Sequence, residues 1–93
     1  MAEIYLDYAA TTPIDPKVLK AMLPYLKQDF GNPSSIHSLG QKALGAIDEA
    51  RKSVADFLGC EAQEIVFTGS ATEANNLAIF GTVKNHETNN PHV

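Results

Sequence analysis

The residues with the clearest chemical potential lie just after the short apolar run at 64–68. Ser70 and Glu73 have the spacing of a capping box, in which the Ser oxygen accepts from the Glu73 backbone N–H and the carboxylate accepts from the Ser70 N–H. A helix that begins here presents unpaired N–H groups and the positive end of its dipole. Such a helix start can bind a phosphate, with the Thr72 hydroxyl as an extra donor, or it can be capped without any ligand.

Two common phosphate-binding loops are excluded at this position. A P-loop would need Gly-Lys-Ser or Gly-Lys-Thr after Gly69, and a dinucleotide fingerprint would need further glycines. A lone cysteine, Cys60, predicts neither a metal site nor an internal disulfide. The helix start at 70–73 is therefore the single candidate site that the residues alone indicate, and they supply no complete catalytic set.

The other side chains that could take part in catalysis have no catalytic partner close by in the sequence. His37 follows a turn-rich loop, where it could touch a ligand, cap a helix or lie at the surface. Asp7 is either a functional carboxylate or a surface residue, and Cys60 is interpreted as a packed or surface thiol. No lysine has the apolar surroundings that favour use as a nucleophile. Solvated positions are expected for the rest: His86, His92, Lys17, Lys20, Lys27, Lys42, Lys52 and Lys84.

Two helices are predicted in the first two thirds of the chain. Asp15 and Pro16 form a typical helix start, and Pro24 is expected to kink this helix or to divide it. After a loop at 31–35, an amphipathic helix is predicted from about Ile36 to Leu58, with Gly59 at its end. Its apolar stripe consists of Ala43, Ile47, Ala50, Val54 and Phe57. Two glycines inside it, Gly40 and Gly45, either weaken the helix or permit close packing.

Extended segments are predicted at two places. Residues 3–9 alternate apolar and polar types, which indicates a short extended segment with Ile4, Leu6 and Tyr8 on one buried face. Residues 64–68 are β-branched and aromatic, which predicts a buried strand, and the helix that starts at Ser70 follows it.

Length and charge exclude several functional classes. The 93 residues are one small domain or less, 44% are apolar and 19% are charged, and this is a globular composition. The net charge of -4 argues against nucleic acid or an anionic membrane as partner. No apolar run approaches the roughly 20 residues of a membrane span, and an acidic residue near the N-terminus argues against a signal peptide. A soluble, cytoplasmic protein is expected.

Three blocks of the sequence, in order, resemble the cysteine desulfurases, which belong to the class V aminotransferase group of pyridoxal-phosphate enzymes. The first is Tyr-Leu-Asp-Tyr-Ala-Ala-Thr-Thr-Pro at 5–13, and the second is Gly-Asn-Pro-Ser-Ser at 31–35, followed by His37 and Gly40. The third is Glu-Ile-Val-Phe-Thr at 64–68 with Ala-Thr-Glu at 71–73. The family commonly has Thr-Ser-Gly before Ala-Thr-Glu, whereas this chain has Thr-Gly-Ser at 68–70.

The resemblance implies the α/β architecture of aspartate-aminotransferase-like, fold type I enzymes, which work as homodimers. Residues 1 to about 35 would be an N-terminal arm and part of the small domain, and residues from about 36 to 93 would start the large cofactor-binding domain. Ala71 and Thr72 would contact the phosphate of pyridoxal 5'-phosphate. The 93 residues on their own would be marginally stable, because the strand containing Ile65 and Phe67 lacks its neighbours.

The activity implied by the resemblance is conversion of L-cysteine to L-alanine, with sulfur transfer through an enzyme persulfide to an acceptor or iron–sulfur scaffold protein. The family's cofactor-bearing lysine, ring-stacking histidine, pyridine-pairing aspartate and catalytic cysteine lie downstream of the matched region. The chain is therefore expected to be the N-terminal portion of a longer enzyme, inactive alone, without a metal. The alternatives are a selenocysteine lyase or related enzyme of the group and, from length alone, a non-enzymatic binding module.

Overall fold

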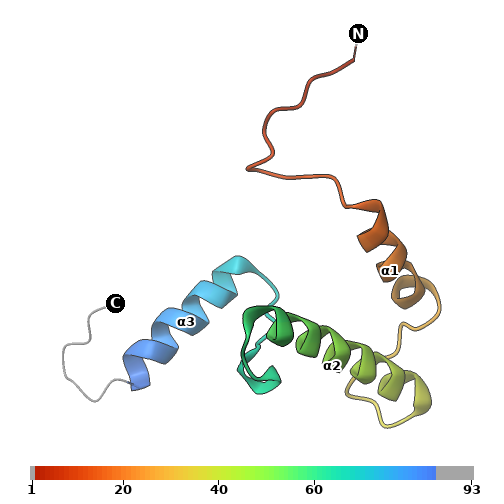
Figure 1. Ribbon diagram of the computed structural model, residues 1–93. Helices are drawn as coiled ribbons and strands as arrows, with labels where there is room; N and C mark the ends of the chain where they lie inside the picture. The colour runs from red at the N-terminus through yellow and green to blue at the C-terminus, as the bar shows by residue number, and fades with distance from the viewer. Residues whose placement is uncertain (1, 86–93) are drawn as a thin grey trace. The chain divides into compact units, whose positions relative to one another are not determined.

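The computed structural model describes residues 2–85 of the chain, and helices are the regular structure of that part. In chain order they are α1 (Pro16–Lys27), α2 (Ser38–Leu58), the short 3-10 helix η1 (Ala62–Glu64) and α3 (Ala71–Asn85), as Figure 1 shows. The chain divides into two compact units, Met1–Arg51 and Lys52–Val93, and the boundary falls within α2. All three predicted helices are confirmed.

Helix α1 begins where the sequence predicts. The Asp15 carboxylate accepts a hydrogen bond from the Lys17 backbone N–H at 2.7 Å, and Pro16 occupies the first helical position. The helix continues through Pro24, so the prediction that this proline divides it is wrong. Pro24 has no N–H to donate to the Lys20 carbonyl, but its own carbonyl accepts from the Gln28 N–H at 2.9 Å. The helix therefore continues to its C-cap at Gln28 with one hydrogen bond missing.

The loop before α2 is held by its own polar groups. The Asn32 carbonyl accepts from the Ser35 N–H at 2.9 Å, and the Asn32 side chain accepts from the Ser34 N–H at 2.8 Å. His37 then caps the helix, because its Nδ1 accepts from the Gly40 backbone N–H at 3.3 Å. Of the roles open to His37, the structure supports that of a helix cap.

The two glycines of α2 have different roles. A Cβ atom on Gly40 would lie 2.6 Å from the Asn32 carbonyl oxygen, and a Cβ atom on Gly31 would overlap the Leu39 carbonyl. The loop and the first turn of α2 therefore pack backbone against backbone, which only glycine permits. Gly45, by contrast, has nothing within 4 Å of a built Cβ, so it only weakens the helix.

The other end of α2 has the predicted glycine stop. Gly59 has a φ of +72°, in the left-handed region, and the Cys60 N–H donates to the Ala55 carbonyl at 3.0 Å. This hydrogen bond belongs to a Schellman motif, which satisfies a carbonyl at the helix end that has no partner within the helix. Cys60 is half-buried in the turn and is neither a metal ligand nor part of a disulfide in the described part of the chain.

The strand predicted at 64–68 is absent from the described residues. Glu64 instead ends η1, where its carboxylate accepts from the Glu61 N–H at 2.8 Å. Ile65 has the extended φ and ψ values of -91° and 121°, and no ladder forms along the residues that follow. The α/β prediction is thus not confirmed within residues 2–85, since a strand needs a neighbour to pair its N–H and C=O groups.

A hydrophobic core is nearly absent from the described residues. Only Ala43 and Ala55 are buried apolar residues among residues 2–85, whereas Phe57 on the predicted stripe of α2 is 88% exposed. The alternating segment at 3–9 is likewise not buried: Ile4, Leu6 and Tyr8 are all exposed. Amphipathic patterns indicate which face can be buried, but burial requires a second layer to cover that face. Local hydrogen bonds therefore carry most of the order in this chain.

The contrast between the glycines of α2 predicts opposite effects of one substitution. Gly40→Ala forces the loop at 31–35 away from α2, and we expect lower helix content in far-ultraviolet circular dichroism. Gly45→Ala is the matched control on the same helix, and it should raise helix content because Ala is favoured over Gly by about 1 kcal/mol. Equal changes in the two variants would contradict the backbone packing described above.

Candidate functional site at the start of helix α3

The start of α3 is capped by Ser70, as the sequence predicts. The Ser70 hydroxyl oxygen accepts from the Glu73 backbone N–H at 3.1 Å, and the Ser70 carbonyl accepts from the Ala74 N–H at 3.1 Å. The Thr68 hydroxyl also donates to the Ser70 carbonyl at 3.0 Å, a contact that the sequence analysis did not anticipate. These hydrogen bonds fix the turn between residues 68 and 70 against the first turn of the helix.

The donor to the Glu73 carboxylate differs from the one predicted for the capping box. The Glu73 carboxylate accepts from the backbone N–H of Gly69, at 2.8 Å, instead of that of Ser70. Gly69 permits this approach because a Cβ atom there would already lie 3.2 Å from the carboxylate oxygen. The order Thr-Gly-Ser at 68–70 thus places the small residue where the carboxylate needs room.

The turn leaves a row of donors open. Within residues 2–85, the N–H groups of Gly69 and Glu73 have partners, whereas those of Ser70, Ala71 and Thr72 have none. Ala71 and Thr72 are both exposed, and the Thr72 carbonyl accepts from the Asn76 side chain at 2.8 Å. Open N–H groups at the positive end of a helix are the donors that a phosphate binds. The donor set therefore fits the phosphate group of a ligand.

One carboxylate lies close to these donors. Glu73 is an acidic residue in the first turn of α3, and such a position is favourable with respect to the helix dipole. Its negative charge would oppose a bound phosphate, but the hydrogen bond from the Gly69 N–H compensates part of that charge. The geometry thus leaves the binding of an anion to the backbone donors and the Thr72 hydroxyl.

The structure does not assemble the other candidate residues around this site. His37 belongs to the first unit, where it caps α2, and Asp7 is exposed with its carbonyl in a turn that accepts from the Ala10 N–H at 3.0 Å. Lys42 is ion-paired with Asp29 at 2.7 Å. The remaining lysines are exposed, as expected: Lys17, Lys20, Lys27, Lys52 and Lys84. His86 and His92 lie outside the described residues.

Two features are absent from the described part of the chain. No group of three or more His, Cys, Asp or Glu side chains within residues 2–85 could hold a metal ion. Among the same residues, no helix is sufficiently long and apolar to cross a membrane. The phosphate-type donor set at the start of α3 is the candidate site that remains.

Comparison with known protein families identifies the class of protein to which the chain belongs. The family model of class-V aminotransferases matches residues 4–91. The chain belongs to this family. This finding confirms the resemblance that the three sequence blocks indicate.

The chain is also similar in sequence to individual known proteins. The chain is 54% identical over 90 residues to the cysteine desulfurase IscS of Rickettsia bellii (strain OSU 85-389), covering 89% of this chain and 22% of the relative. It is 53% identical over 91 residues to that of Rickettsia massiliae (strain Mtu5), covering 97% and 22%. It is 50% identical over 91 residues to that of Dictyoglomus turgidum (strain DSM 6724 / Z-1310), covering 98% and 23%. The chain thus spans less than a quarter of the length of these relatives.

The cap at Ser70 can be tested by substitution. Ser70→Ala removes the acceptor for the Glu73 N–H and should cost about 1 kcal/mol of local helix stability. We expect about fivefold faster amide hydrogen exchange in the first turn of α3, measured by mass spectrometry on peptides from this region. Ser70→Asp keeps an acceptor and should retain the protection. Equal exchange in the Ala and Asp variants would contradict the role of Ser70 as the cap.

Proposed function

We propose that this chain is the phosphate-binding part of a cysteine desulfurase that uses pyridoxal 5'-phosphate. The observation that carries the proposal is the open donor set at Ser70, Ala71 and Thr72 in a chain of the class-V aminotransferase family. The substrate is L-cysteine, and the products are L-alanine and sulfur carried as a persulfide to an acceptor or iron–sulfur scaffold protein. The similarity to relatives named cysteine desulfurase IscS supports this assignment.

The chain's own residues bind and orient the cofactor. The backbone N–H groups of Ala71 and Thr72, with the Thr72 hydroxyl, donate to the phosphate, and the α3 dipole favours its negative charge. The hydrogen bond between Gly69 and Glu73 holds the preceding turn in place. When bound, pyridoxal phosphate supplies the electron sink for the bond changes on the substrate. An anchored phosphate fixes the position of the cofactor ring, and precise placement is a large part of catalysis.

The remaining assignments are inferred from the family. We infer that residues 1 to about 35 form an arm and part of the small domain, and that residues from about 36 onward start the large domain of a fold type I homodimer working in the cytoplasm. The extended backbone at Ile65 is compatible with a strand that forms once neighbouring strands are present. The 93 residues alone are expected to bind the phosphate group weakly and to be inactive.

The activity can be tested on the protein as the cell produces it, which contains these residues. With pyridoxal phosphate and dithiothreitol as the reductant, we expect L-cysteine to yield equal amounts of alanine and sulfide. L-selenocysteine, supplied instead, distinguishes the selenocysteine lyase alternative. If selenide forms and sulfide does not, the proposed substrate is wrong. If neither forms and an amino group is transferred to a keto acid, the protein is an aminotransferase of the same family.

The phosphate contact of Thr72 gives a sharper prediction. Thr72→Val removes one donor to a charged group and should weaken binding of pyridoxal phosphate by the natural protein about tenfold. Binding of pyridoxal, which has no phosphate, should be unchanged, and both are measured by absorbance titration. Thr82→Val is the matched control, since the Thr82 hydroxyl donates to the Ala78 carbonyl at 2.7 Å further along α3. Equal losses in the two variants would contradict the phosphate role.

A further inference from the structure

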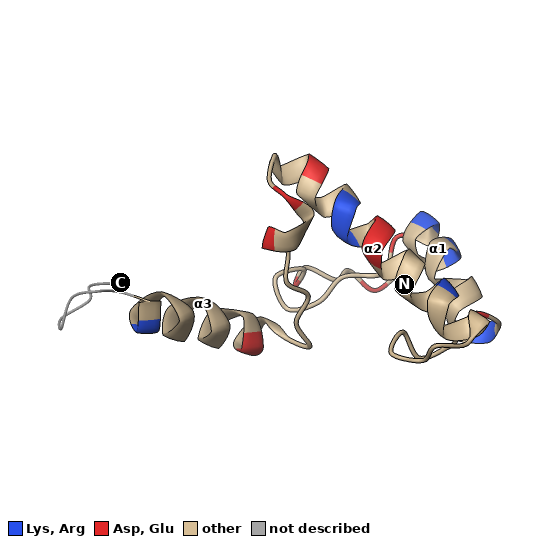
Figure 2. Ribbon diagram, turned by 90° about the horizontal axis from the view of Figure 1, so that it is seen from below, with Lys and Arg blue, Asp and Glu red and all other residues tan. Residues whose placement is uncertain are grey.

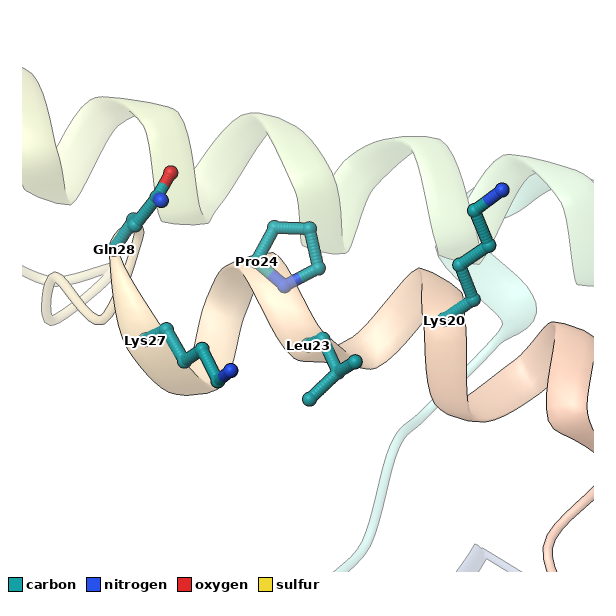
Figure 3. A pocket seen from close by; sticks show the side chains of 5 residues that line it. All are labelled: Lys20, Leu23, Pro24, Lys27 and Gln28. Carbon is teal, nitrogen blue, oxygen red and sulfur yellow. The ribbon is translucent and has the colours of Figure 1, made fainter.

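We draw no further inference here: the strongest candidate, the open pocket on one side of the lysine-bearing helix α1 (Figure 2), lined by Lys20, Leu23, Pro24, Lys27 and Gln28 (Figure 3), carries nothing, because a single helix forms it and nothing in the structure shows what covers it.

Discussion

The unpaired N–H groups at the start of each helix are the constraint on which the rest of this structure depends. With only Ala43 and Ala55 buried among the apolar residues at 2–85, packing contributes little, and the helix starts must be stabilised locally. Each of the three α-helices meets this need with a different side chain: Asp15 for α1, His37 for α2 and Ser70 for α3. Each cap also leaves first-turn N–H groups without a partner within residues 2–85, such as those of Val18, Leu39 and Thr72.

The sequence predicted the local features of the fold well. Caps, proline at a helix start and glycine at a helix end act within one turn, so Asp15, Pro16 and Gly59 could be placed from residue types alone. The strand at 64–68 could not, because β-branched residues predict extended backbone but a ladder depends on a second segment. The apolar stripe of α2 is buried only at Ala43 for the same reason, since periodicity identifies a face without supplying what covers it.

The candidate site was predicted in position but not in detail. Ser70 and Glu73 have a spacing that indicates a helix start, whereas the choice of Gly69 over Ser70 as the donor to Glu73 depends on the path of the turn. The exchange of Gly and Ser relative to the common family order was the available signal, because it places the residue without a side chain next to the carboxylate. His37 shows the converse case: its type suggested chemistry, and its position made it a cap.

The Schellman turn at Gly59 also has a consequence for the handedness of the backbone. A φ of +72° is strained for every L-residue with a side chain but relaxed for its mirror image. A Cβ atom added to Gly59 would have nothing within 4 Å, so this side of the chain offers open space. In a chain short enough for total chemical synthesis, a D-alanine at position 59 would therefore suit the turn better than glycine itself, because it loses less conformational freedom on folding.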